Sequence, residues 1–352
     1  MTTRLTNSIA TSTRTLHWSR RPALLLPVLI TIAVCSIVFA CVIGSVPLSL
    51  SELGQAVMAM VQGSDNTTLA SSLLDLRLSR AMTGFVTGAT LALSGVMMQA
   101  LLRNPLADPY VLGISGGASV AALAMILFYG SLWMIDLAAF CGALAVALLL
   151  FALAYRDFKG NGSSDGSAPL LLLTGVIVAA GCGALITLML SVAPDSRLRG
   201  MVFWMIGDLS ASQSRWMPWL VWGTVLTLAM RYARSINIAA MHADTAHTLG
   251  VNVGRLRQFL FLGAALLTAS AVSTAGSIGF VGLIMPHACR FALGPDHRLL
   301  IPAATLAGGS FLVFADTIAR TVVAPQQLPV GVITALIGVP VFLLQLHQLR
   351  RH

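Results

Sequence analysis

Residues 258–289 read QFLFLGAALLTASAVSTAGSIGFVGLIMPHAC, a run of 32 residues that contains no charged side chain. A membrane helix needs about 20 mostly apolar residues, so this run is too long for a single span. Small and polar residues interrupt it at 273–279, where the sequence is STAGSIG. We therefore expect one membrane helix followed by the start of a second, which continues to about residue 294.

Similar uncharged windows occur along the rest of the chain, at 22–51, 81–102, 109–135, 137–155, 166–194, 216–230, 299–315 and 321–349. Together with the two spans of 258–289, they predict an all-α polytopic membrane protein with ten transmembrane helices. Only 9% of the 352 residues are charged, whereas a soluble domain carries about 25%. This composition excludes a soluble enzyme, a disordered chain and a nucleic-acid-binding module.

The distribution of basic residues predicts the orientation in the membrane. With ten spans, both termini lie on the same side, and cytoplasmic termini place fifteen of the 21 Lys and Arg residues inside. We expect a cytoplasmic segment at 1–21, a ten-helix domain at 22–349 and a tail at 350–352. The window at 22–51 is longer than the apolar part of a signal peptide, so it is interpreted as a retained span. The six outside arginines are Arg77, Arg80, Arg197, Arg199, Arg215 and Arg320.

Several kinds of chemistry are missing from the sequence. The centres of the predicted spans lack Asp, Glu, Lys and Arg, which argues against a proton relay. The chain has no GxxxxGK[ST] motif, so any ATP-driven step requires another polypeptide. Its five cysteines lie in apolar stretches without metal-ligand spacing. We therefore expect no catalytic residues, no metal site and no cofactor bound by this chain.

The predicted cytoplasmic loop at about 235–257 differs from the other loops. Residues 238–249 are interpreted as a short amphipathic helix, and Gly250 is expected directly after its end, in the position that favours a left-handed residue. Such a helix can lie on a membrane or dock on a protein. Because its polar face carries a single charge, the pattern favours a protein partner.

The chain as a whole resembles the permease family of bacterial ABC importers for iron chelates and cobalamin. The resemblance spans roughly residues 24–349, and its motifs occur in a specific order. They are RLSR at 77–80, LSGVMMQ at 93–99, RNPLADP at 103–109, LGISGGA at 112–118, FWMIG at 203–207, GSIGFVGLIMPH at 276–287, DHR at 296–298 and LPVG at 328–331. The resemblance implies a homodimer in the lipid bilayer of the bacterial inner membrane, with two cytoplasmic ATPase subunits that bind ATP and Mg and a periplasmic substrate-binding protein.

The resemblance also implies roles for individual residues. Arg77, Arg80 and Arg320 match arginines that bind glutamates of the binding protein, although interfacial arginines often only reach toward the headgroups. Residues 104–106 (Asn104, Pro105 and Leu106) match a cytoplasmic gate, and the alternative is an ordinary helix-ending turn. The segment 238–250 matches the coupling helix on the ATPase. The residues assigned to coupling are His242, Asp244, His247, Leu249 and Gly250.

Two observations limit this transfer of roles. Family members commonly carry Gly-Asp/Glu-Glu near the start of the coupling helix, whereas this chain has His242-Ala243-Asp244, so the partner of Asp244 stays open. His287 and His297 match positions shared with members that carry non-haem substrates. They are therefore interpreted as structural or loop histidines rather than haem ligands.

The predicted function is that of the transmembrane permease subunit of an ATP-driven importer. It would move an iron chelate, haem or a ferric siderophore, from a periplasmic binding protein to the cytoplasm. Cobalamin is the alternative cargo within the same family. From other functional classes, an ATP-independent secondary transporter or channel and a non-transporting receptor are the competing hypotheses.

Overall fold

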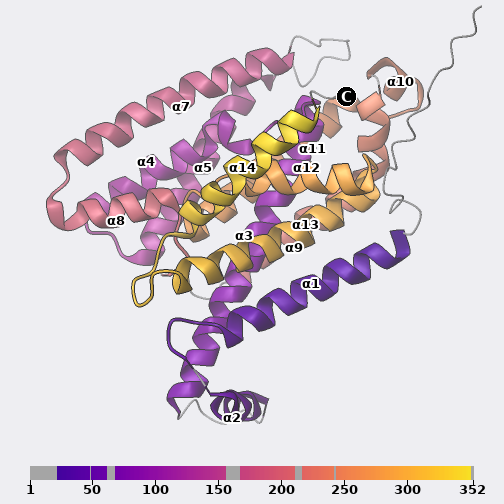
Figure 1. Cartoon of the computed structure of the whole chain (residues 1–352). Coiled ribbons are helices and arrows are strands. Elements are labelled where there is room, and N and C mark those ends of the chain that lie inside the picture. The colour runs from indigo at the N-terminus through magenta and orange to yellow at the C-terminus, as the bar shows by residue number, and fades with distance from the viewer. Residues whose placement is uncertain are drawn as a thin grey trace, which may run out of the picture.

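The computed structural model describes residues 22–47, 49–61, 68–155, 167–210, 216–241 and 243–349. Within these residues every regular element is a helix (Figure 1). The predicted terminal segments 1–21 and 350–352 lie outside the described residues. The helices are α1 (Pro22–Val42), α2 (Leu50–Val61), α3 (Leu69–Leu102), the 3-10 turn η2 (Pro109–Leu112), α4 (Ile114–Leu127), α5 (Leu132–Leu153), α7 (Ser167–Val192), α8 (Asp195–Ile206), α9 (Trp216–Met241), α10 (Ala243–Thr248), α11 (Val253–Ala275), α12 (Val281–Leu293), α13 (His297–Thr321) and α14 (Val330–Leu349).

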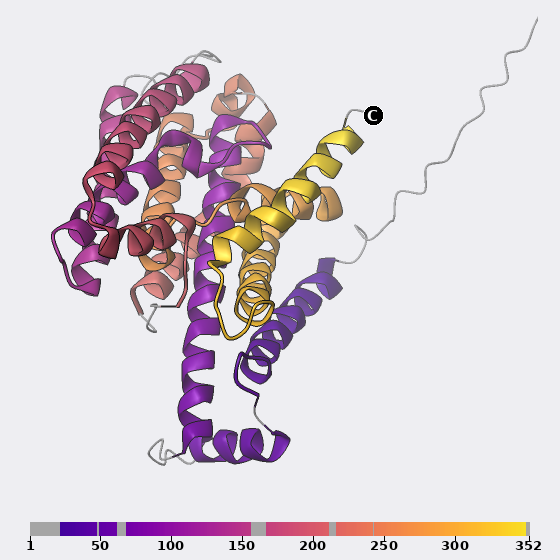
Figure 2. The ribbon, with the colours of Figure 1, turned by 60° about the vertical axis from the view of Figure 1, so that its left-hand side comes forward.

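Helix α3 is the central element of the fold. It runs the length of the molecule, with α2 lying across its N-terminal end (Figure 2). It packs against α13, α11, α12, α1 and α9, and 89% of its most apolar window is buried. At 34 residues and about 1.5 Å of rise per residue, α3 spans about 50 Å and connects the two ends of the molecule.

Two pairs of glycines allow the neighbours of α3 to approach it closely. A Cβ atom on Gly95 would lie 1.8 Å from the carbonyl oxygen of Gly282 in α12, and one on Gly88 would lie 2.3 Å from the carbonyl oxygen of Gly308 in α13. No side chain fits into either contact. Small residues at such positions let helix backbones touch, which is how membrane helices gain packing energy in the absence of a hydrophobic driving force.

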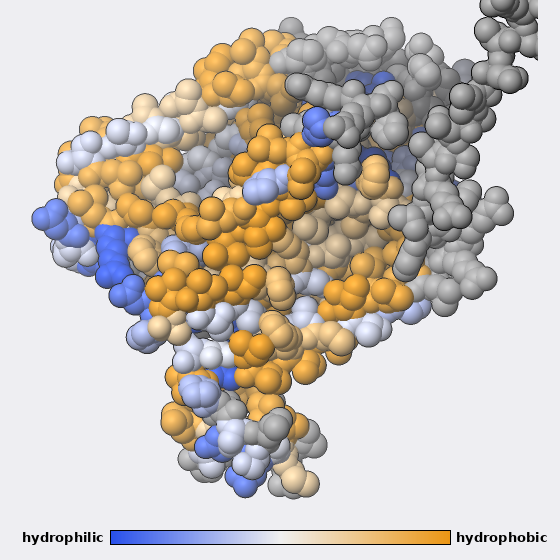
Figure 3. Space-filling view, in the orientation of Figure 1, coloured by the Kyte–Doolittle hydropathy of each residue, from blue (hydrophilic) through white to orange (hydrophobic). Residues whose placement is uncertain are grey.

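The outer helices expose apolar side chains. Only 17% of the most apolar windows of α1 and α7 is buried. Apolar side chains cover most of the face seen in Figure 3, and hydrophilic ones gather over α8 and near α2. Among the described residues, six helices, α1, α3, α5, α7, α11 and α13, are long and apolar enough to cross a membrane, and α4, α12 and α14 are shorter apolar helices. These observations identify a polytopic membrane protein.

The predicted break in 258–289 is confirmed. Helix α11 ends at Ala275 and α12 begins at Val281, and between them Gly276 (φ 70°) and Phe280 (φ 71°) adopt left-handed backbone conformations that interrupt the helix. Each of the other predicted windows also contains a helix that overlaps it. The count of ten membrane crossings, with both termini in the cytoplasm, remains a prediction.

Some element boundaries differ from the sequence prediction. Helix α3 begins twelve residues before the window at 81, because Thr68 caps it by accepting a hydrogen bond from the Ser71 N–H. Helices α2 and α8 lie outside the interiors of the predicted spans and were not expected. Helix α9 continues past the charged residues Arg231 and Arg234, which face the exterior, and ends at Met241.

Candidate functional site

The three arginines predicted to dock a binding protein come together at one end of the fold. Arg77 and Arg80 lie in the third turn of α3, and Arg320 lies in the last turn of α13. All three line a cavity of about 480 Å³. Its other lining residues include Ser45, Asp75, Leu209, Ser210 and Gln327. The structure therefore gathers residues that are 240 positions apart in the sequence into one cationic site.

Arg80 is held by an internal carboxylate that the sequence analysis did not single out. Its Nη2 lies 2.8 Å from Asp316 Oδ1, and its Nε donates to Oδ2 at 3.0 Å. Its Nη1 donates to the side-chain oxygen of Gln327 at 2.7 Å. Arg320 Nε lies 3.7 Å from Asp316 Oδ2, so the same carboxylate serves two arginines. The contact between Asp316 and Arg320 could have been predicted from the sequence, because residues four apart on a helix are neighbours. The contact between Asp316 and Arg80 could not.

Arg77 and Arg320 are buried and bind the end of α1. Arg77 is 6% exposed and donates to the carbonyl oxygens of Cys41, Val42 and Val46, while Arg320 is 5% exposed and donates to that of Ala40. Carbonyls at a helix C-terminus lack intrahelical partners, and cations are favoured there. These two arginines therefore already stabilise the end of α1. Arg80 has the more accessible side chain, at 12% against 6% for Arg320.

The predicted gate residues follow directly after α3. Asn104, Pro105 and Leu106 are all exposed. The loop is held by its own hydrogen bonds, in which the Leu106 N–H donates to Asn104 Oδ1 at 2.9 Å and the Ala107 N–H donates to the Asn104 carbonyl at 3.1 Å. A short, exposed and internally bonded loop has the shape that closing a pathway requires, and its role as a gate remains a prediction.

The predicted coupling segment divides between two helices. Residues 238–241 belong to the end of α9 and Ala243–Thr248 form α10, whereas the prediction was a single helix over 238–249. Residue 242, between the two, lies outside the described residues. The expected end of the segment is confirmed, because Gly250 has a φ of 78°. Its N–H donates to the His247 carbonyl, and the Val251 N–H donates to that of Ala246, which is a Schellman motif.

The side chains assigned to coupling are only partly described. His247, Leu249 and Gly250 are exposed, and Leu249 keeps 60% of its surface open. His242 and the side chain of Asp244 lie outside the described residues. Helix α10 lies at the opposite end of the molecule from α2 (Figure 1). The candidate coupling surface is therefore far from the arginine cavity.

Two contacts near this end were not predicted from the sequence. Arg103 Nη2 donates to the carbonyl oxygen of Ala239 in α9 at 3.0 Å. Asn237, also in α9, donates to Asp296 Oδ1 at 2.6 Å and accepts a hydrogen bond from the His297 N–H at 2.9 Å. His297 Nδ1 lies 2.8 Å from the same amide oxygen, so this histidine contributes to packing between helices.

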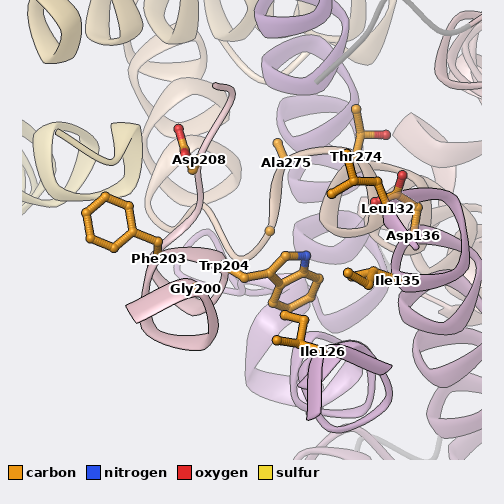
Figure 4. A pocket seen from close by; sticks show the side chains of 11 residues that line it. Ile126, Leu132, Ile135, Asp136, Gly200, Phe203, Trp204, Asp208, Thr274 and Ala275 are labelled. Atoms are coloured by element: carbon orange, nitrogen blue, oxygen red, sulfur yellow. The ribbon is translucent and has the colours of Figure 1, made fainter. Parts of the chain in front are cut away.

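A second cavity, of about 310 Å³, lies between α4, α5, α8 and α11. Trp204 reaches into it toward Ile126 and Ile135 (Figure 4). Asp208 is on its lining, but its carboxylate already accepts a hydrogen bond from the Ser210 N–H at 2.9 Å. The volume is at the lower end of the range for ligand pockets, and none of the residues assigned a role from the sequence lies there.

The model of the FecCD transport family matches residues 29–348. The cobalamin import system permease protein BtuC of Halobacterium salinarum is 44% identical over 76% of this chain and 71% of its own length. The hemin transport system permease protein HmuU of Yersinia pestis is 37% identical over 84% of this chain and 89% of its own. The vitamin B12 import system permease protein BtuC of Escherichia coli is 37% identical over 78% and 83%.

Solved structures share the fold. An ABC transporter described as being of metal-chelate type, in an inward-facing conformation, matches with a TM-score of 0.77 and 28% identity, covering 93% of this chain and 99% of the other. PsaBC from Streptococcus pneumoniae, solved in complex with Fab, matches with a TM-score of 0.52 and 16% identity, covering 83% and 94%. At 16% identity, the second match supports a shared fold and nothing further.

Proposed function

Because the chain belongs to the FecCD transport family, an ABC transporter permease family of the bacterial inner membrane, we propose that it is the membrane subunit of an importer for a bulky metal chelate. The observation that carries this proposal is the family match over 29–348, which includes the arginine cavity, the gate loop and α10. The chain lacks a P-loop, so ATP and Mg would bind a separate ATPase subunit.

The proposed assembly is a homodimer of ten-helix subunits with two ATPase subunits and a periplasmic binding protein. Substrate would pass along the axis between the two copies of the chain. The exposed apolar faces of outer helices such as α7 are compatible with contacts to lipid or to a second copy.

Each end of the molecule has a proposed role. The arginine cavity would receive carboxylates of the binding protein, with Arg80 as the most accessible arginine. Helix α10 would rest on the ATPase, and the loop 104–106 would close the cytoplasmic side. ATP binding would then shift the equilibrium between closed and open arrangements by favouring one of them.

The cargo is proposed as a chemical class: haem, a ferric siderophore or cobalamin. The 37% identity to a hemin permease equals that to one cobalamin permease and is below the 44% to another. No group of three or more His, Cys, Asp or Glu side chains is placed to hold a metal within the described residues. The cargo would therefore be selected by the binding protein and by the shape of the pathway, and sequence identity does not choose between haem and cobalamin.

Reconstitution tests the proposal. The chain, its ATPase and its binding protein are placed in proteoliposomes, and uptake of haem, a ferric siderophore and cobalamin is measured side by side. We expect saturable uptake of one of them that requires both ATP and the binding protein. An ATPase variant with its P-loop lysine replaced is the matched control. Uptake that follows an ion gradient without ATP would instead support a secondary transporter.

A further inference from the structure

A direct contact joins the gate loop to the helix that leads into α10. Arg103 is the residue between α3 and Asn104, and its Nη2 donates to the carbonyl oxygen of Ala239 at 3.0 Å. Ala239 lies in the last turn of α9, which ends at Met241, and α10 begins at residue 243. The two residues are 136 positions apart, so the contact depends on the tertiary fold.

The contact satisfies a specific need of α9. The last four carbonyls of an α-helix have no partner within the helix, and the carbonyl of Ala239 is one of them. A cation is also favoured by the dipole at a helix C-terminus. Arg103 therefore caps the end of α9 from a different helix, so a displacement of that end acts on Arg103.

The backbone of Arg103 is adapted to this position. Its φ of 50° is left-handed, which is uncommon for a residue other than glycine, and its N–H donates to the Gln99 carbonyl and closes α3. A glycine would adopt this conformation more readily and would end the helix as well. The arginine side chain contributes what a glycine lacks, which is the bond to α9.

On the gate side, the loop is stiff enough to follow Arg103. The Asn104 N–H donates to the Gln99 carbonyl at 3.2 Å, and the side chain and carbonyl of Asn104 accept hydrogen bonds from the N–H groups of Leu106 and Ala107. Pro105 has a fixed φ and removes further freedom. A displacement of Arg103 therefore carries Asn104 to Leu106 with it.

On the coupling side, the end of α9 is also held. Asn237 bonds Asp296 and His297 at the start of α13, and α10 packs against α9. His297 is 4% exposed, whereas Asp296 is exposed. A force on α10 therefore reaches a helical segment, residues 237–241, that is hydrogen-bonded to the start of α13.

We propose that Arg103 is the positioning residue through which movement of α10 reaches the gate loop. The proposal rests on the proposed function, because it assigns a mechanical link between the coupling helix and the gate of that importer. Arg103 contacts neither substrate nor ATP in this role. It makes the position of residues 104–106 depend on the position of residues 237–241.

The test uses the full complex in proteoliposomes and measures ATP hydrolysis and substrate uptake together. Arg103→Gly removes the side chain and keeps a residue that favours the left-handed conformation, so the fold is expected to persist. We expect assembly and ATP hydrolysis to be retained, while uptake per ATP falls about 2- to 30-fold, the range of coupling effects seen for such residues. Arg103→Lys, which keeps a donor and the charge, should restore a substantial part of the ratio. Arg231→Ala, at an exposed arginine of α9 outside the coupling loop, is the matched control and should leave the ratio unchanged.

A second measurement follows the gate directly. A Leu106→Cys reporter is labelled from the aqueous phase with and without a non-hydrolysable ATP analogue. Nucleotide should change the labelling rate when Arg103 is present and leave it unchanged in the Arg103→Gly background. Unaltered uptake per ATP in Arg103→Gly, or an equal loss of uptake and ATP hydrolysis, would overturn the inference. Absence of ATP-dependent uptake in the unmodified complex would instead refute the proposed function.

Discussion

Arg80 and Asp316 form a bidentate ion pair between α3 and α13, with Arg80 Nη2 2.8 Å from Asp316 Oδ1 and Arg80 Nε 3.0 Å from Asp316 Oδ2. Asp316 is 3% exposed and also faces Arg320. The pair joins the two helices at the end where docking is proposed. A carboxylate of an incoming binding protein would therefore meet an arginine that already has an internal acidic partner.

Removing this internal carboxylate should destabilise the chain. In Asp316→Ala, Arg320 stays buried without its acidic neighbour, and breaking a buried pair in this way costs about 3 kcal/mol or more. We expect a lower melting temperature of the purified complex in detergent. Asp75→Ala is the control, because Asp75 is an exposed carboxylate of α3 that lines the same cavity as Arg80 and Arg320. Equal melting temperatures for the two variants would contradict the structural role of Asp316.

Docking should depend most on Arg80. Arg80→Gln removes the charge of the most accessible arginine of the cavity, and we expect a slower association of the binding protein, by about tenfold at low salt, with a weaker dependence on salt. Surface plasmon resonance on the complex in nanodiscs measures both quantities. Arg199→Gln, an exposed arginine of α8, is the matched control. An unchanged association rate in Arg80→Gln would exclude Arg80 from docking.

Charge reversal of Arg77, Arg80 and Arg320 together should abolish docking, but this triple variant is a weaker test. Arg77 and Arg320 hold the end of α1, so reversing them would place acidic groups against backbone carbonyls. We expect a loss of folded protein along with the loss of docking. Size-exclusion chromatography of the variant before the binding assay separates the two effects.

If residues 104–106 form the cytoplasmic gate, substitutions that weaken this loop should let substrate leak out. Asn104→Ala with Leu106→Ala removes the acceptor that orders the loop and the apolar side chain that would close the pathway. We expect faster loss of substrate from preloaded proteoliposomes without ATP. Asn104→Asp alone keeps the acceptor for the Leu106 N–H and should retain substrate. Unchanged retention in the double variant would count against a gate at 104–106.

Asp108 predicts a pH dependence of stability. Burial raises the pKa of its carboxyl from 3.8 to about 6, and the hydrogen bond from the Tyr110 N–H opposes this shift only partly. Because the folded state binds the proton more tightly than the unfolded state does, its contribution to stability is complete below about pH 4 and is lost as the pH rises through about 6.

Asp108→Asn tests this dependence. Asparagine keeps the cap on η2 without titrating, so we expect the variant to gain stability relative to the unmodified chain between pH 5 and pH 7.5, by at most about 1.4 kcal/mol. Melting temperatures at the two pH values measure the gain. A gain that is equal at the two pH values would contradict this dependence.

The sequence predicted the helical, membrane-spanning class because that class depends on local composition. A run of uncharged apolar residues identifies a span wherever it occurs, and the break after Ala275 was visible as a cluster of small residues. Helices α2 and α8 were missed because they are only 12 residues long and carry polar residues, so the hydropathy pattern does not distinguish them from loops.

The candidate site was predictable only in part, for a different reason. The positions of Arg77, Arg80 and Arg320 followed from family motifs, and the structure brings them together. Their partners did not follow, because Arg80 and Asp316 are 236 residues apart and Arg103 and Ala239 are 136 apart. Such pairings arise from helix packing, and no local pattern in a single sequence encodes them.

The glycine contacts of α3 limit how this molecule is able to move. At Gly88 and Gly95, the backbone of α3 touches those of α13 and α12 with no room for a Cβ atom. If α3 slid by one helical turn past α12, the side chain of Leu91 or Gln99 would face the Gly282 carbonyl in place of Gly95. These contacts resist sliding of the three helices past one another. We therefore expect α3, α12 and α13 to move together during transport, with the relative motion concentrated in the helices around them.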